Sequence, residues 1–168
     1  MSGVQILHIM HMKDAANVCL HLLSYAGPLV SDLTDEHLGL AADTNGKTAG
    51  WLIGHLCVTG DFVRRKCGRS PLTPKDWGPK FAPGTQPSRS RDDYPAIDAM
   101  RTAFDGIYRD LASTAPTLAP DLLASLSPYE PGRDRFATFG EFIKWVMTGH
   151  LGYHLGQLYG WRGSAGLK

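Results

Sequence analysis

The apolar side chains of this 168-residue chain recur at spacings of three and four positions in four separate segments. This spacing places side chains on one face of an α-helix, and the every-second-residue alternation of β-strands is not sustained anywhere. The first segment runs from about Met10 to Leu29, and Gly27-Pro28 is expected to mark its end. Its apolar face is predicted to contain Val18, Leu22, Tyr25 and Leu29.

The second segment follows a turn signal, Asn45-Gly46, and has Thr48 in position to act as its N-cap. It continues to about Lys66 and ends before Gly68. The pattern therefore predicts a helix of about five turns, flanked at both ends by residues that favour non-helical backbone.

The third segment begins near Tyr94, carries apolar residues at helical spacing, and ends before Pro116. The fourth begins at Thr138, which forms a capping-box pattern with Glu141, and continues to about Arg162. Four helices of this length predict an all-α fold, a four-helix bundle, in a single domain over residues 1–168.

A long Pro-rich loop at about residues 68–91 separates the second and third helices, with prolines at 71, 74, 79, 83 and 87. Loops of this length inside a compact domain are uncommon and are often functional or mobile. Trp77 and Phe81 are expected to hold the loop against the body of the protein.

Composition narrows the choice of partners. Seventeen Lys and Arg against sixteen Asp and Glu give a net charge of +1, so no basic surface argues for nucleic acid or a membrane surface. No apolar run approaches the roughly 20 residues that span a bilayer, and the N-terminus does not have the pattern of a signal peptide. Three cysteines without a C-x-x-C pair are expected to be reduced thiols, which predicts a cytoplasmic location.

Two of the seven histidines, His150 and His154, lie four residues apart on the fourth predicted helix. They project from one face about one turn apart, which allows two imidazoles to bind a single metal ion. Chance also produces this spacing in a chain with seven histidines, so core histidines satisfied by hydrogen bonds are the alternative. Their face is the apolar one, formed by Ile143, Met147, His150, His154 and Leu158.

The second helix carries a similar residue, His55, among Trp51, Val58, Thr59 and Phe62. A lone histidine on an apolar face is more often a core residue than a ligand. Three histidines around one ion would leave a coordination position open for water or substrate, as in catalytic zinc sites. Nearby glycines at 54, 149, 152 and 156 are costly in helices and suggest close backbone approach or space for a ligand.

These segments resemble the DinB-like superfamily of metal-binding four-helix bundles (DinB/YfiT type). The residues that carry the resemblance are Trp51-Leu-Ile-Gly-His55-Leu and His150-Leu-Gly-Tyr-His154-Leu-Gly-Gln157-Leu158. The second of these is similar to the family signature H-x-x-Y-H-x-G-Q, which is more specific than H-x-x-x-H. The helix layout resembles the family across most of the chain.

The resemblance implies an up-down-down-up bundle that forms a homodimer and binds a divalent ion through His55, His150 and His154. Zn²⁺ or Ni²⁺ is expected, although three imidazoles also suit copper and iron. The family includes thiol-S-transferases and a thiol-dependent isomerase, which implies a metal-dependent transferase or hydrolase that acts on a small electrophilic substrate, with a low-molecular-weight thiol as a possible co-substrate. The alternative is a non-catalytic, metal-binding stress-response protein with a structural or sensory ion.

No catalytic residue or general base is identified from the sequence. Gln157 follows His154 by three positions and is a candidate to hydrogen-bond a ligand histidine or a metal-bound water; a packing role is the alternative. Asp61 is predicted to be a surface carboxylate, and Tyr153 to make core or dimer contacts. His8, His11, His21 and His37 are expected to be solvated.

The cations Arg64, Arg65 and Lys66 lie in the last turn of the second predicted helix. Cations there oppose the negative end of the helix dipole, which gives the cluster a structural role. Binding of an acidic substrate is the alternative role for the same cluster.

Overall fold

The structure, a computed structural model, describes residues 3–42 and 46–167. Its regular secondary structure over these ranges is helical, apart from an isolated bridge between Leu126 and Thr138. The α-helices are α1 (Gly3–Ser31), α2 (Ala49–Lys66), α3 (Trp77–Phe81), α4 (Ile97–Thr114), α5 (Pro120–Ala124), α6 (Phe139–Trp145) and α7 (Leu151–Ser164). A π-helical turn, η5 (Val146–His150), joins α6 to α7. Short 3-10 turns are η1 (Asp35–His37), η2 (Arg91–Asp93), η3 (Ala115–Thr117) and η4 (Glu130–Gly132). The all-α prediction is confirmed.

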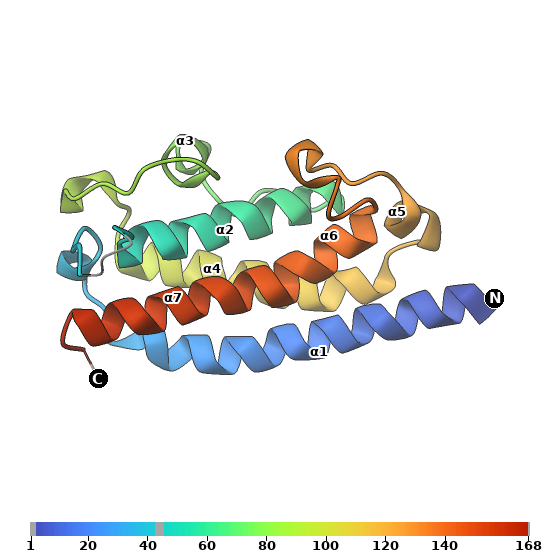
Figure 1. Ribbon diagram of the computed structural model, residues 1–168, viewed down its shortest axis with the longest axis horizontal. Coiled ribbons are helices and arrows are strands. Elements are labelled where there is room, and N and C mark those ends of the chain that lie inside the picture. Colours follow the sequence, from blue (N-terminus) through green and yellow to red (C-terminus); the bar gives the residue numbers. More distant parts are fainter. Residues whose placement is uncertain (1–2, 43–45, 168) are drawn as a thin grey trace.

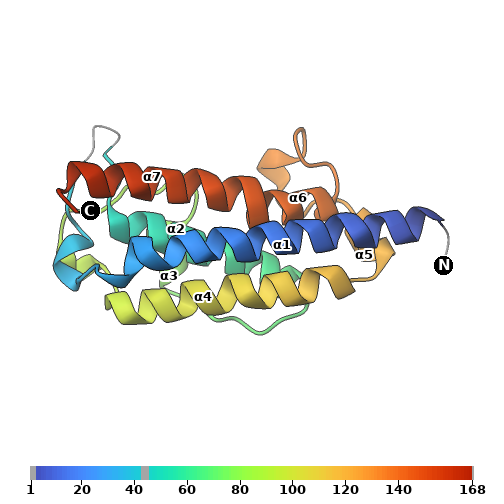
Figure 2. The same cartoon turned by 90° about the horizontal axis from the view of Figure 1, so that it is seen from below.

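Four long helical segments lie side by side: α1, α2, α4 and the continuous α6–η5–α7 (Figures 1 and 2). Their inward faces share a core of buried apolar side chains, among them Leu52, Met100, Ile107 and Leu158. The short helices α3 and α5 lie outside these four segments (Figure 1). None of the described helices has both the length and the apolar character that a membrane crossing requires.

The predicted helix starts of α2 and α6 are confirmed by their caps. The hydroxyl of Thr48 accepts the backbone N–H of Trp51 at 3.2 Å. At the second start, the Thr138 hydroxyl accepts the N–H of Glu141, whose carboxylate accepts the N–H of Thr138 at 2.9 Å. These bonds satisfy N–H groups that have no partner within the first helical turn. Asn45 of the predicted turn lies outside the described residues.

Helix α1 is longer than its pattern indicates, and the predicted end at Gly27-Pro28 is wrong. Proline disfavours helical backbone at the preceding residue because its ring collides with that residue's Cβ. Here the preceding residue is Gly27, which has no Cβ, and the helix continues through Pro28 to Ser31.

The predicted apolar face of α1 is also wrong. Val18 and Tyr25 are 46% and 59% exposed, and Leu22 and Leu29 are only partly buried. From Met12 onwards, the residues that α1 buries share a different face and are mostly small: Met12, Ala15, Ala16, Cys19, Leu23, Ala26 and Val30. Small side chains let neighbouring helices approach closely, so the buried face is not the one with the bulkiest residues.

Helix α4 begins at Ile97 rather than near Tyr94. Pro95 disfavours helical backbone at Tyr94, and the helix starts two residues after the proline. Its first N–H group is satisfied from a distant part of the chain, because the carboxylate of Asp35 accepts the Ile97 N–H at 2.7 Å. Arg91 donates to the other oxygen of the same carboxylate at 2.5 Å.

Asp61 is fully buried, so its prediction as a surface carboxylate is wrong. The face of α2 opposite His55 is covered by the start of the 68–91 loop and not by solvent. One carboxylate oxygen accepts from Arg64 at 2.8 Å and from the Leu72 N–H at 3.0 Å. The other accepts from both the N–H and the hydroxyl of Thr73. Asp61 therefore fixes the loop on α2.

Candidate metal centre

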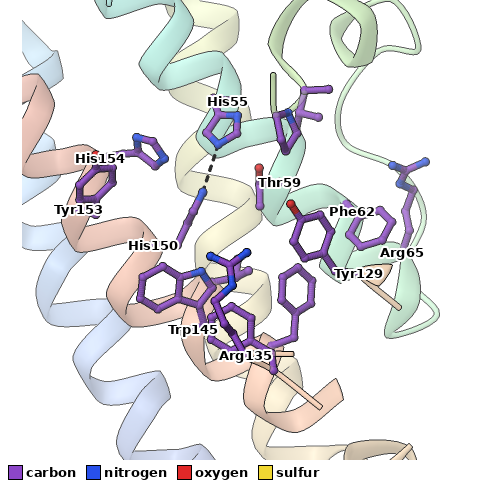
Figure 3. A pocket seen from close by; sticks show the side chains of 16 residues that line it. His55, Thr59, Phe62, Arg65, Tyr129, Arg135, Trp145, His150, Tyr153 and His154 are labelled. Atoms are coloured by element: carbon purple, nitrogen blue, oxygen red, sulfur yellow. Dashed lines mark hydrogen bonds between the residues drawn. The ribbon is translucent and has the colours of Figure 1, made fainter. Parts of the chain in front are cut away.

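The structure brings three histidines together from three different elements: His55 on α2, His150 at the end of η5, and His154 on α7 (Figure 3). One ring nitrogen from each lies within 4.8 Å of the others. The Nε2 atoms of His55 and His150 are 3.1 Å apart. His55 and His154 are buried and His150 is partly buried, so the group lies below the surface of the helices.

Hydrogen bonds on the outer nitrogens orient two of the three imidazoles. His55 Nδ1 lies 2.8 Å from the carbonyl oxygen of Phe81, which accepts only, so Nδ1 carries the proton and the Nε2 lone pair faces the other histidines. His154 Nδ1 lies 2.7 Å from Gln157 Oε1, with the same consequence. Gln157 in turn donates from Nε2 to the Tyr153 hydroxyl at 3.1 Å. Such outer partners hold metal-ligating histidines in position.

Burial keeps these imidazoles uncharged. It lowers the pKa of His150 to about 3, with a smaller contribution from His154 and His55. Burial also lowers the pKa of His154 to about 4, and the nearby His55 acts in the same direction. The pKa of His55 is lowered mainly by burial. All three are therefore neutral at pH 7, which is the state that binds a metal.

The group fits a divalent ion. A tetrahedral zinc ion with bonds of 2.0–2.1 Å separates its ligand nitrogens by about 3.3 Å, close to the 3.1 Å between His55 and His150. Without an ion, one of these two nitrogens must carry a proton and donate it to the other. His150 Nδ1 is buried without a hydrogen-bond partner. Among the described residues, no other His, Cys, Asp or Glu joins the group, so one side of an ion would face away from protein ligands.

The 68–91 loop supplies part of this geometry through α3. The ring of Phe81 packs on Gly54 so closely that a Cβ there would lie 2.5 Å from the ring. The carbonyl oxygen of the same residue orients His55. On its other side, His55 stacks on Trp51 with ring centroids 4.7 Å apart, and Lys47 lies 3.8 Å above the Trp51 ring. The loop is thus part of the site, which gives a physical reason for its length.

The π-helical turn η5, which ends at His150, shapes the side of the site away from the 68–91 loop. A π turn adds one residue to a helical turn, and such turns often occur at functional sites. The ring of Trp145 folds over Gly149, where any Cβ would overlap it. Trp145 is therefore able to lie beside His150, with ring centroids 6.4 Å apart.

A cavity of about 470 Å³ opens beside the three histidines (Figure 3). Its lining includes the histidines and a mainly aromatic and apolar wall: His55, Val58, Thr59, Phe62, Arg65, Ala82, Pro83, Tyr129, Arg135, Phe136, Phe142, Trp145, Val146, His150, Tyr153 and His154. This size is within the range of small-molecule sites, about 300–1,000 Å³. The site therefore has room for a substrate next to a bound ion.

Several residues of the cavity were not identified from the sequence. Tyr129, Arg135 and Phe136 come from the irregular segment between α5 and α6, where no periodic pattern indicates direction. Tyr153 lines the cavity and contacts Gln157; its predicted core role is wrong, because the side chain is 60% exposed, and its predicted dimer contact stays a prediction. Trp145 lies five positions before His150 and lines the cavity next to the π turn. The sequence pattern does not predict this turn, so it did not indicate Trp145.

The other histidines lie away from the group. His11 and His21 are exposed, and His37 is partly buried, where its ring nitrogen takes part in the cap of η1. The side chain of His8 lies outside the described residues. The structure thus separates the three histidines of the group from the remaining ones that it describes.

Comparison with known protein families gives a match. The family model of the DinB superfamily matches residues 24–158, which is most of the chain and includes all three histidines. No curated protein and no solved structure matches the chain.

Proposed function

Because the chain belongs to the DinB superfamily, we propose that it binds one divalent metal ion through His55, His150 and His154 and uses it to convert a small electrophilic molecule. The observation that carries this proposal is the convergence of three neutral imidazoles beside an open, mostly apolar cavity. Zn²⁺ and Ni²⁺ are the ions expected, since both bind imidazole well.

When bound, such an ion supplies a water or thiol with a lowered pKa, and therefore an anionic nucleophile at neutral pH. The protein's own residues hold the ligand histidines in position and orient their rings. Phe81 and Gln157 accept the Nδ1 protons of His55 and His154 and so fix the two rings. The Nε2 lone pairs then stay available for a metal ion. The ligand histidines are not expected to act as bases, because the lone pairs of their inner nitrogens would bind the metal ion.

Thiol transfer and hydrolysis are the two reactions that fit this arrangement. In the first, a low-molecular-weight thiol is the nucleophile and the substrate is an electrophile; in the second, water takes the place of the thiol. The open side of the group favours an enzyme, whereas a structural ion is normally enclosed by four protein ligands. A non-catalytic stress-response protein with a sensory ion is the alternative.

A screen of the metal-loaded protein tests this proposal. The protein is incubated with a panel of small electrophiles, with and without small thiols, and substrate loss is followed by mass spectrometry. Thiol-dependent loss indicates a transferase, and thiol-independent loss indicates a hydrolase. The His154→Ala variant and the chelated protein are the controls and should be inactive. Turnover that does not need metal, or no turnover with any pair, contradicts the enzymatic proposal.

The up-down-down-up four-helix bundle, the homodimer and the cytoplasmic location belong to the same proposal. In Figure 1, α2 and α4 run in one direction while α1 and α7 run in the other, which supports the bundle topology. Exposed aromatic side chains on α1 and α7, Tyr25 and Tyr159, are available for contact with a second copy. Light scattering after size-exclusion chromatography distinguishes dimer from monomer.

A further inference from the structure

Two arginines, Arg65 and Arg135, line the cavity beside the histidines, and no aspartate or glutamate lines it among the described residues. The rest of the lining consists of the three histidines, Thr59 and aromatic or apolar side chains. A cavity with apolar walls and charges of a single sign raises the local concentration of ligands of the opposite sign. The cavity therefore favours an anion.

Arg65 has no strong partner among the residues that the structure describes. Its nearest carboxylate is that of Asp61, with Nε and Oδ2 3.9 Å apart. A carboxylate offers about four lone-pair sites, and Asp61 already accepts four hydrogen bonds from Arg64, Leu72 and Thr73. The guanidinium of Arg65 is half exposed and donates no hydrogen bond within the described part of the chain.

Arg135 also lacks a close carboxylate partner among the described residues. Its closest carboxylate belongs to the adjacent Asp134, at 3.7 Å, where both side chains are largely exposed. Figure 3 shows Arg135 entering the cavity near Trp145, with Arg65 at the outer edge beyond Phe62. By contrast, Arg64 and Arg69 share the carboxylate of Asp110 at 2.7–2.8 Å. Arg65 and Arg135 thus keep N–H donors for a ligand, whereas Arg64 and Arg69 donate theirs to Asp110.

The wall between Arg65 and the histidines is aromatic, and it offers flat apolar surfaces to a ligand. Phe136 stacks on Trp145 with ring centroids 5.3 Å apart, and Tyr129 stacks on Phe142 at 5.2 Å. One polar atom is buried in this wall without a partner: the hydroxyl oxygen of Thr59, one helical turn after His55. Buried hydroxyls normally have a hydrogen-bond partner, so this one points to a polar group on the ligand.

We propose that the cavity binds an aromatic carboxylate, with its carboxylate at Arg65 on the outer edge, its ring against the aromatic wall, and a polar group near Thr59 and the histidines, where Arg135 adds a second positive charge. This inference deepens the proposed function, on which it rests, by naming the substrate class. Guanidinium groups bind carboxylates through two parallel hydrogen bonds, and aromatic rings stack favourably on one another.

Binding of matched probes to the metal-loaded protein tests this proposal. Naphthalene-2-carboxylate and naphthalene-2-carboxamide have the same ring and nearly the same shape, and differ in charge. Isothermal titration should show the carboxylate binding about tenfold more tightly, a modest value because both arginines are partly exposed. This preference should shrink towards one in Arg65→Met/Arg135→Met. It should persist in Arg109→Met, which removes one positive charge from an exposed helix position outside the cavity.

Three further measurements separate the possible outcomes. Circular dichroism establishes that the double variant is folded, and wild-type binding of the carboxylate alone should weaken as salt is raised. In chelated protein the preference for the carboxylate should remain, because it depends on the arginines. The inference therefore survives even if the metal proposal fails. A carboxylate preference that vanishes on chelation but persists in the double variant assigns the carboxylate to the ion and overturns the inference. Equal binding of both probes, or binding of neither, also overturns it.

Discussion

Replacing Gly54 with alanine tests how the loop controls the histidine group. The added Cβ would lie 2.5–2.7 Å from three atoms of the Phe81 ring. Carbon atoms in good contact are about 3.5–4.0 Å apart, so the ring must retreat by about 1 Å. Overpacking of this kind costs about 1–3 kcal/mol, and the better helix propensity of alanine offsets about 1 kcal/mol. We expect a net loss of about 1 kcal/mol in the free energy of unfolding.

The same shift acts on the histidine group, because the displaced residue also orients His55. Where the Phe81 backbone follows its ring by about 1 Å, the 2.8 Å hydrogen bond from His55 Nδ1 to the Phe81 carbonyl stretches beyond bonding distance. Loss of such a partner typically lowers metal affinity about 10- to 100-fold. Gly54→Ala should therefore weaken zinc binding, measured by competition with a chromophoric chelator, and lower the Tm by about 2–4 °C.

Gly160→Ala is the matched control. Gly160 is an exposed helical glycine with no atom within 4 Å of the position of a Cβ. Alanine there should raise stability by up to about 1 kcal/mol and leave zinc affinity unchanged. If Gly54→Ala behaves like this control in both measurements, Phe81 does not constrain His55 and the role assigned to the loop is incorrect.

Three further outcomes follow from the structure. Gln157→Leu removes the acceptor of the His154 Nδ1 proton and should lower zinc affinity about 10- to 100-fold in a competition titration; unchanged affinity would leave Gln157 only a packing role. Asp61→Ala removes one of the two carboxylate partners of buried Arg64 and the acceptor of the Leu72 and Thr73 N–H groups, and should lower the free energy of unfolding in urea by about 3–5 kcal/mol, against less than about 1 kcal/mol for Asp105→Ala, an exposed pair. In metal-free protein, the lowered pKa values of the buried imidazoles mean that the unfolded chain binds more protons than the folded one. Stability should therefore be fully present above about pH 6.5 and fall towards pH 4, by up to about 1.4 kcal/mol per pH unit for each imidazole, and a flat urea profile over this window would contradict their burial.

Local chemistry explains which parts of the fold could be predicted from the sequence. The caps at Thr48 and Thr138 depend on residues three positions apart, so the sequence contains all the information they need. The start of α4 is different, because the acceptor of its first N–H is Asp35, more than 60 positions away. Helix α1 continues past Pro28 because Gly27 relieves a local clash, and its buried face consists mainly of small residues that a search for bulky apolar ones overlooks.

The candidate site divides in the same way. The spacing of His150 and His154 indicates a shared face, but the meeting with His55 depends on how two helices pack, and the sequence supported it mainly through the family resemblance. Asp61 could not be placed from α2 alone, because a loop covers the face of the helix that was expected to meet solvent. Arg135 comes from a segment without periodicity, so only the folded chain brings it to the cavity.

The metal content of the purified protein tests the central claim most directly. Inductively coupled plasma mass spectrometry on zinc-loaded, desalted protein should give about one ion per chain in the wild type and in His21→Ala, whose histidine is exposed and distant from the group. His154→Ala should retain little or none. Equal metal content in His154→Ala and the wild type, or a wild type that binds no ion, would contradict the assignment of His55, His150 and His154 as one metal centre.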